Sequence, residues 1–435
     1  MRKAEPEFME GHIVTDSGFL EHHRLWIQDG RILSIEPISH PGLDENLFIL
    51  PGWRDQHIHD LFGQQMAAHH PALLAERFHA VTQTLGRHGV TGVYLATFGD
   101  TVDNLETYCR AARQWMDSSA NGRAGAKLLG IHLEGSFLNR ECRGAQPAEH
   151  IWLPTEMDCG AILERLCQTG AVRLVNIVPD HGLPSLLLIQ KARQLGLMVG
   201  SGHTKASATL LKQAYEEYGL QYLVHFTNGP TGQSFKPFGG GGAFEGGMNC
   251  PIVKELIPDG YHIDPRYVRD IIHRCEERWG EKQIIAVTDA LTPLSDQLGS
   301  QEIQIGSTIA QIDPSRNALF TTAYRQPDGS RLPAPPGTLC GGIQLLDQIF
   351  ENLLNLFTHE MEGYWLRHPA LPFAQALGKA SRLCSTNQAL LEENTTTGIL
   401  APDHVADCIQ ARITKGPDRW KLQIQQVWVE GIAIL

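Results

Sequence analysis

Six histidine and carboxylate side chains lie at the ends of apolar, strand-like runs, and all six are residue types that bind divalent metal ions. They are His57, His59, Glu134, His203, His225 and Asp289. His57 and His59 are two positions apart, so on a strand both side chains point to one face and can reach one cation. The alternative is that such residues only cap strands, since the chain has 20 histidines. Their repeated position at strand ends favours a metal site.

The runs that carry these residues alternate with segments of helical spacing. Residues 71–89 and 207–219 repeat apolar side chains with the period of a helix. The strand-like runs are LFILPGW, TGVYLATF, KLLGIHLEG, VRLVNIVPD, LMVGSGHT, QYLVHFTN and KQIIAVTDA. Repeated βα units predict a parallel sheet buried on both faces, and their number favours a closed (β/α)8 TIM barrel, with a doubly wound open sheet as the alternative. In such a barrel, polar residues at the carboxyl ends of the strands form the active site.

Both ends of the chain are rich in short β-like runs. Residues 11–38 alternate apolar runs with turn signals such as Asp29-Gly30, and residues 405–413 and 420–435 are separated by the turn-like sequence KGPDR. We therefore expect a small discontinuous domain in which the two termini pair.

Composition narrows the class of protein. The chain has 435 residues with 42% hydrophobic residues, and it lacks an apolar run long enough to cross a bilayer. The N-terminus has no apolar segment typical of a secretory signal, so we expect a cytoplasmic protein. A net charge of -12 argues against a nucleic-acid partner. The nine cysteines include no C-x-x-C pair, which argues against a disulfide framework.

The order of several motifs resembles the N-acetylglucosamine-6-phosphate deacetylase family of the amidohydrolase superfamily, from about residue 48 to residue 410. The motifs are PGWRDQHIHD, HGVTGVYLATF, HLEGSF, GHTKAS, VHFTNGP, PDGYHIDP, VTDALTP, GTLCGG and TGILAPDHVADCIQ. The resemblance implies a metal-dependent (β/α)8 barrel at residues 50–395 and a small β-sandwich domain built from residues 1–49 and 396–435. It also implies a homodimer.

The resemblance assigns roles to the residues at the strand ends. Glu134, His203 and His225 match the family's principal metal ligands, and His57 and His59 match a pair that supports a second metal in some members. Zinc, as one or two ions, is the expected metal, because it accepts this ligand set and activates water at neutral pH. Asp289 matches the general base, which takes a proton from the attacking water and delivers it to the leaving amine.

The substrate side departs from the family pattern. Asn228, Gly229 and His262 match substrate-binding positions, but Gln146 stands where the family typically has a histidine. The family's phosphate-binding arginine is missing, and Lys236 is the candidate replacement, although a lysine lacks the planar fork of an arginine. For His132 we expect a buried, hydrogen-bonded histidine, and either His132 or His262 is a candidate to stabilise the oxyanion.

The predicted function is metal-dependent hydrolysis of an N-acetyl amide in a small amino-sugar substrate. The expected reaction converts N-acetylglucosamine 6-phosphate to glucosamine 6-phosphate and acetate. An amidohydrolase for another N-acetyl sugar or an N-acyl amino acid is the alternative. A catalytically silent barrel that serves as a scaffold is disfavoured, because all five candidate ligands and the base are present.

Overall fold

The computed structural model describes residues 5–39, 42, 44–59, 71–144, 146–228, 241–291, 302–305, 308–313, 318–326 and 328–435. Its centre is an eight-stranded sheet in which each strand pairs in parallel with the next along the chain. The strands are β5 (Trp53–His59), β6 (Val90–Ala96), β7 (Lys127–Phe137), β8 (Val172–Ile177), β9 (Met198–Ser201), β10 (Tyr222–Leu223), β11 (Val253–Leu256) and β12 (Ile284–Ala286).

Backbone contacts between β5 and the segment after β12 close this sheet into a barrel. The amide of Asp289 donates to the carbonyl of His57 at 2.8 Å, and the amide of His59 donates to the carbonyl of Ala290 at 2.9 Å. The predicted TIM barrel is confirmed, and the open doubly wound sheet is excluded. The closure also lays His57, His59 and Asp289 next to one another at the carboxyl ends of the first and last strands.

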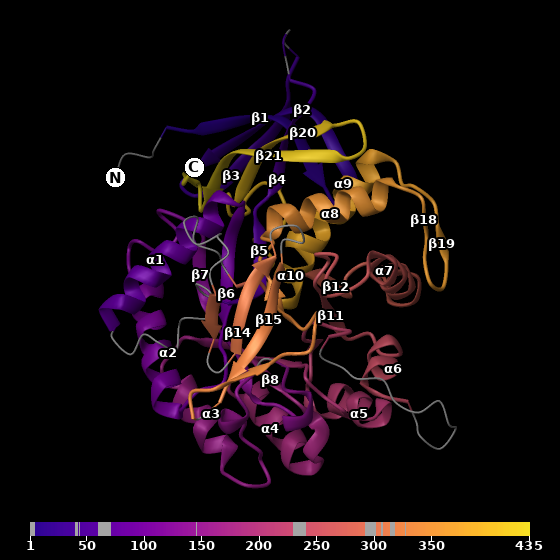
Figure 1. Ribbon diagram of the computed structural model, residues 1–435. Coiled ribbons are helices and arrows are strands. Elements are labelled where there is room, and N and C mark those ends of the chain that lie inside the picture. The colour runs from indigo at the N-terminus through magenta and orange to yellow at the C-terminus, as the bar shows by residue number, and fades with distance from the viewer. Residues whose placement is uncertain are drawn as a thin grey trace.

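Helices cover the outside of the barrel (Figure 1). They are α1 (Pro71–Arg87), α2 (Val102–Met116), α3 (Cys159–Cys167), α4 (Leu183–Gln194), α5 (Ala208–Tyr218), α6 (Ala243–Met248), α7 (Pro265–Trp279) and α8 (Leu346–Thr358). The helical segments predicted at 71–89 and 207–219 correspond to α1 and α5. Side chains of Thr101, Asp158 and Ser207 cap the N-termini of α2, α3 and α5. After α8, α9 (Phe373–Ser381) and α10 (Asn387–Leu391) lead to the C-terminal strands.

The two termini pair in one seven-stranded sheet, as the sequence predicts (Figure 1). Its strands are β1 (Glu7–Thr15), β2 (Gly18–Gln28), β3 (Arg31–Pro37), β4 (Leu47–Pro51), β20 (Cys408–Lys415), β21 (Trp420–Val429) and β22 (Ile432–Ala433). β4 joins the two ends of the chain, because it pairs in parallel with β1 and antiparallel with β20. The domain boundaries at residues 49, 50, 395 and 396 stay a prediction.

The run LFILPGW, which the sequence suggests as one strand, is divided between two sheets. Its first part is β4 in the sheet of the termini, and the barrel strand β5 begins at Trp53. Gly52 lies at the division, and a Cβ there would meet the Thr91 side chain at 2.3 Å. The close approach of Thr91 explains why a glycine separates the two strands.

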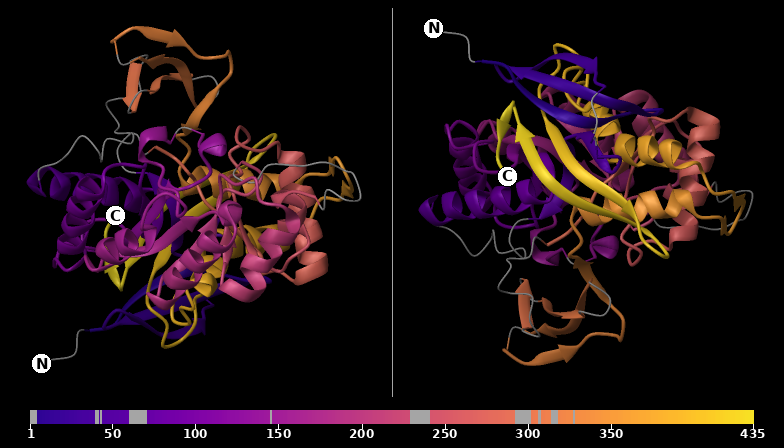
Figure 2. Two further views of the ribbon diagram at one scale, coloured as in Figure 1. Left: turned by 90° about the horizontal axis from the view of Figure 1, so that it is seen from below. Right: turned by 90° about the horizontal axis from the view of Figure 1, so that it is seen from above.

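An antiparallel sheet inserted between β12 and α8 has no counterpart in the sequence prediction. It comprises β13 (Glu302–Ile305), β14 (Thr308–Asp313), β15 (Ala318–Arg325), β16 (Arg331–Pro333) and β17 (Leu339–Gly342). Both views in Figure 2 show these orange strands standing out from one side of the barrel. A small hydrophobic cluster that includes Phe98, Leu291 and Leu319 joins the inserted sheet to the barrel. A short hairpin of β18 (Met361–Glu362) and β19 (Arg367–His368) follows α8.

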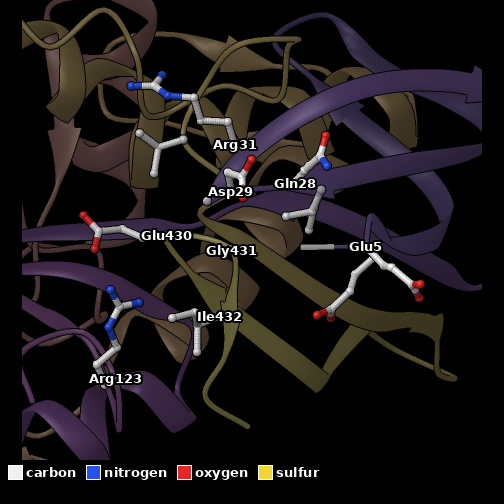
Figure 3. A pocket seen from close by; sticks show the side chains of 12 residues that line it. Glu5, Gln28, Asp29, Arg31, Arg123, Glu430, Gly431 and Ile432 are labelled. Atoms are coloured by element: carbon white, nitrogen blue, oxygen red, sulfur yellow. The ribbon is translucent and has the colours of Figure 1, made fainter. Parts of the chain in front are cut away.

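A hollow of about 550 Å³ lies where the sheet of the termini meets the segment between α2 and β7. Figure 3 shows its acidic and basic side chains, among them Glu5, Arg31, Arg123 and Glu430, spread around the rim. Its described lining contains neither histidine nor cysteine, so the candidate chemistry lies elsewhere. None of the helices in the described part of the chain combines the length and the apolar character of a membrane span.

A buried ion pair fastens the first barrel strand to the end of α10. The guanidinium of Arg54 contacts both carboxylate oxygens of Glu392, and both side chains are at most 6% exposed. We expect Glu392→Ala to lower the free energy of unfolding by about 3–5 kcal/mol, because it leaves a buried charge unpaired. Arg110→Ala removes a solvent-exposed ion pair on α2 and should cost less than about 1 kcal/mol. Denaturant titration checks both values, and equal losses would contradict the argument.

Candidate metal centre

The carboxylate of Glu134, on β7, lies at the centre of the predicted ligands. Its Oε1 atom is 3.1 Å from Nε2 of His203 and 3.1 Å from Nε2 of His225. Its Oε2 atom is 3.8 Å from Nε2 of His59, and Oε1 is 3.8 Å from Nε2 of His57. These five residues lie near the carboxyl ends of four barrel strands or just after them, and the closed barrel brings them to one point.

Asp289 completes the cluster from the segment after β12. Its Oδ1 atom is 3.3 Å from Nε2 of both His57 and His59. Burial opposes ionisation of this carboxyl, but the imidazoles of His57 and His59 outweigh burial and lower its pKa. Asp289 is therefore a carboxylate at neutral pH.

Three of the imidazoles have the same hydrogen-bonding arrangement. Nδ1 of His57 donates to Oε2 of Glu255 at 3.0 Å, that of His59 to the carbonyl of Ala96 at 3.2 Å, and that of His203 to the carbonyl of Cys142 at 2.7 Å. In a neutral imidazole the other nitrogen then carries a lone pair. Each of these Nε2 atoms faces a carboxylate oxygen of Glu134 or Asp289. A lone pair facing a carboxylate needs a cation between the two, which a proton or a metal ion provides.

The donor set fits a divalent ion. Three overlapping groups have ligand atoms within 4.8 Å of one another: His57, His225 and Asp289; His57, His59 and Glu134; and Glu134, His203 and His225. Nε2 of His57 is buried and has no hydrogen-bond partner among the described residues, which leaves it available as a ligand. Burial disfavours a charge on His57, yet Asp289 and Glu255 raise its pKa to about 10. The same surplus of negative charge would stabilise a bound metal ion.

The backbone at the centre is strained. His203, His225 and Asp289 have φ angles of 58°, 29° and 44°, and Thr227 has a φ of 86°. Residues other than glycine rarely adopt this left-handed region, and the surrounding structure must hold them there. Such strain clusters at functional sites, and it supports a functional role for these three side chains.

Sequence reasoning missed Glu255, which lies on β11. This side chain is fully buried and accepts hydrogen bonds from Nδ1 of His57 and, at 2.9 Å, from the amide of His225. The strand β11 has only four residues and contains Lys254 next to Glu255, so it lacks the apolar run that marks the other strands. The sequence shows seven strand-like runs where an eight-stranded barrel needs one more, and β11 lies between the runs QYLVHFTN and KQIIAVTDA.

The side chain of Gln146 forms a hydrogen bond with the carboxylate of Glu134. Its side-chain amide donates to Oε2 of Glu134, and its Oε1 accepts from the amide of Gly99 at 2.9 Å. Both ends of the Gln146 side chain are thus fixed, and the residue is 3% exposed. A Cβ on Gly135 would meet the amide nitrogen of Gly99 at 2.1 Å, so this arrangement requires glycine after Glu134. Gln146 therefore orients a candidate ligand as well as facing the pocket.

Two of the other predicted substrate residues, Asn228 and His262, contact each other. Nδ1 of His262 donates to Oδ2 of Asp259 at 2.7 Å, and the side chain of Asn228 donates to the carbonyl of His262 at 2.9 Å. Gly229 and Lys236 lie outside the described residues. His132 is fully buried, as expected, and shares a hydrogen bond of 3.2 Å with the hydroxyl of Tyr222.

A cavity of about 200 Å³ opens above the cluster. Its lining includes the polar residues Glu134, Gln146, His203, His225, Asn228, His262 and Asp289, and the less polar residues Phe98, Leu291, Leu339 and Cys340. His132 is not among the lining residues, so of the two oxyanion candidates only His262 faces the cavity. Larger hollows lie elsewhere on the molecule, but this one contains the histidines and carboxylates that can carry out chemistry.

A closed parallel barrel with histidines and carboxylates gathered at its strand ends is the arrangement that the sequence predicts for an enzyme of the amidohydrolase type. No family model matches the chain. The chain is 29% identical over 282 residues to an N-acetylgalactosamine-6-phosphate deacetylase from Escherichia coli O157:H7, which covers 64% of this chain and 70% of the relative. It is 27% identical over 321 residues to the N-acetylglucosamine-6-phosphate deacetylase of Bos taurus, which covers 69% of this chain and 74% of the relative.

A solved structure extends the likeness to the whole fold. A mutant N-acetyl-D-glucosamine-6-phosphate deacetylase from Mycobacterium smegmatis, in complex with N-acetyl-D-glucosamine-6-phosphate, matches with a TM-score of 0.76 and 19% identity over 99% of this chain and all of the other. The curated relatives are deacetylases of N-acetylated hexosamine phosphates. The predicted resemblance and the prediction of an amidohydrolase-type enzyme are confirmed.

We expect Glu134→Gln to remove the metal, because a neutral amide is a poorer ligand than a carboxylate. The loss of affinity should exceed the roughly 100-fold effect of outer-shell substitutions. Metal content per chain, measured by elemental analysis after dialysis, checks this. Glu156→Gln, an exposed carboxylate paired with Arg140, is the matched control and should keep the wild-type content. Full occupancy in Glu134→Gln would refute the role of Glu134.

Proposed function

We propose that the protein is a metal-dependent deacetylase that hydrolyses N-acetylglucosamine 6-phosphate to glucosamine 6-phosphate and acetate. The observation that carries the proposal is the joint position of Glu134, His203, His225 and Asp289 around one cavity. The names of the relatives support an N-acetylated hexosamine phosphate as the substrate.

The proposed chemistry needs a nucleophile, a proton carrier and a place for the acetyl group. Glu134, His203 and His225 would hold a divalent ion, which would supply a Lewis acid and activate water as the nucleophile at neutral pH. Asp289, ionised and at the edge of the cavity, accepts a proton from the attacking water and returns it to the leaving nitrogen. A carboxylate can do both because the proton that it takes up is the one that the amine needs.

The cavity walls suit the two parts of an N-acetyl amide. Phe98, Leu291 and Leu339 offer an apolar surface for the acetyl methyl group. His262, whose Nδ1 is fixed by Asp259, is suited to donate a hydrogen bond from Nε2 when it is protonated, and Asp259 raises its pKa against the effect of burial. We assign substrate contacts to Gln146, Asn228, Gly229, Lys236 and His262.

Finer features of the function are part of the same proposal. Zinc is the proposed ion, because imidazole and carboxylate ligands suit it. We propose that His57 and His59 hold a second ion or keep Asp289 ionised by lowering its pKa. A cytoplasmic location and a homodimer are proposed from the sequence and from the resemblance.

A second candidate is an amidohydrolase for a different N-acetylated sugar. The observation that favours it is Gln146, which hydrogen-bonds Glu134 where the family typically has a histidine that contacts substrate. An N-acyl amino acid is a more distant choice. The complete set of ligands and the strained backbone argue against a silent scaffold.

The role of Asp289 is tested by Asp289→Asn. We expect kcat to fall by about 10²–10⁴-fold, the usual contribution of a general acid or base, with metal content nearly unchanged. Asp103→Asn on α2 changes an exposed carboxylate and should leave kcat as in the wild-type enzyme. Retained deacetylation in Asp289→Asn would remove Asp289 from the mechanism.

The substrate is tested by steady-state hydrolysis with zinc-loaded protein. N-acetylglucosamine 6-phosphate, N-acetylgalactosamine 6-phosphate and unphosphorylated N-acetylglucosamine are compared, with Asp289→Asn as the blank. We expect the highest kcat/KM for N-acetylglucosamine 6-phosphate, because a phosphate adds charged contacts that the free sugar lacks. Equal activity on the free sugar would refute phosphate recognition, and a preference for the galactose epimer would change the proposed substrate.

A further inference from the structure

The strand β11 contains two consecutive charged residues, and both are buried. Lys254 and Glu255 are both fully buried. Because successive side chains of a strand point to opposite faces, they lie on different sides of the barrel wall. The ammonium group of Lys254 donates to the backbone carbonyls of Cys250 and Ile252, at 3.1 and 2.6 Å. Lys254 therefore does not neutralise Glu255, and the carboxylate faces the inside of the barrel.

Glu255 accepts hydrogen bonds from two different segments of the metal centre. Its Oε2 atom is 3.0 Å from Nδ1 of His57 on β5 and 2.9 Å from the amide of His225 after β10. The backbone carbonyl of Glu255 also accepts from the amide of Phe226 at 2.8 Å. One residue of β11 thus holds two consecutive amides of the strained segment around His225.

These contacts fix the imidazole of His57 and the backbone that carries the imidazole of His225. The bond from Nδ1 of His57 leaves its Nε2 atom directed at Asp289 and Glu134. At His225, where φ is 29°, the two bonds to Glu255 hold a conformation that the backbone alone disfavours. The imidazole of His225 is thereby kept with Nε2 at 3.1 Å from Glu134.

The position of Glu255 is costly unless a cation is present. Its Oε1 atom is buried and has no hydrogen-bond partner among the described residues. A buried carboxylate with an unpaired oxygen loses hydration, and a nearby positive charge is what compensates such a loss. A histidine that donates from one nitrogen to a carboxylate and binds a metal through the other is a recurring arrangement around metal ions.

We propose that Glu255 is a positioning residue of the metal centre, which orients His57 and His225 together and strengthens their binding of the ion. This inference rests on the proposed function, because it requires a metal at the cluster. It concerns a residue on the seventh barrel strand, which supplies none of the predicted ligands.

The test is zinc affinity, measured by competition with a chelating dye on full-length wild-type and Glu255→Gln protein. Glutamine keeps the shape and one acceptor oxygen but removes the charge. We expect zinc to bind about 10–100-fold more weakly, as is typical when an outer-shell partner is changed. Cobalt(II)-loaded protein should also show shifted visible absorption bands, because the ligand field changes with the imidazoles.

Glu276→Gln is the matched control. Glu276 lies on α7, is 16% exposed and pairs with Lys379, so its loss removes a partly buried charge away from the centre. It should alter thermal stability and leave zinc affinity and the cobalt spectrum unchanged. Should Glu255→Gln fail to fold, Glu255→Asp keeps the charge but is too short to reach both donors, and a similar loss of affinity is expected.

The outcomes separate this inference from the proposed function. Wild-type protein that binds no zinc would refute the metal-dependent function, and the inference would fall with it. Wild-type protein that binds zinc, together with Glu255 variants of equal affinity and unchanged cobalt spectrum, would overturn the positioning role alone.

Discussion

The balance of charge at the mouth of the barrel governs the rest of the site. Glu134 and Glu255, both buried, and Asp289, 17% exposed, bring three carboxylates to within hydrogen-bonding reach of the imidazoles. In a water-poor interior such groups repel one another and lose hydration unless cations lie between them. His57 illustrates the effect, since these carboxylates raise its pKa to about 10 despite its burial. A divalent ion, with two positive charges, would relieve the same imbalance more completely than a proton.

Barrel closure is what allows that balance to be built. Asp289 and His57 come from opposite ends of the barrel sequence, yet the amide of one donates to the carbonyl of the other. The ligands therefore sit on strands whose positions are fixed by the whole fold. Strained φ angles at His203, His225 and Asp289 are tolerated because ladder hydrogen bonds and side-chain contacts hold both sides of each residue.

The strand-end residues could be predicted from the sequence because each follows a run of apolar residues, and because the barrel places all strand ends together. The strand β11 could not be predicted in this way, because two of its four residues are charged and its hydropathy is that of a surface segment. Glu255 was hidden for that reason. The role of Gln146 was also invisible, because its contact with Glu134 joins residues on a loop and a strand whose geometry no local pattern specifies. The inserted sheet of β13 to β17 was not predicted, and its residues lie inside the range 50–395 that was assigned to the barrel domain.

The candidate metal ligands lie at the barrel strands, whereas the candidate substrate residues lie on connecting segments. This difference explains why the reaction is easier to assign than the substrate. Glu134, His203, His225 and Asp289 are anchored by the barrel, and replacing any of them would disturb several contacts at once. Asn228 and His262 lie on connecting segments, where a substitution changes one wall of the cavity and leaves the centre intact, whereas Gln146 also contacts Glu134. Selectivity among N-acetylated hexosamines can therefore change while the metal chemistry stays the same. The occurrence of both glucosamine and galactosamine phosphate deacetylases among the relatives is consistent with this division.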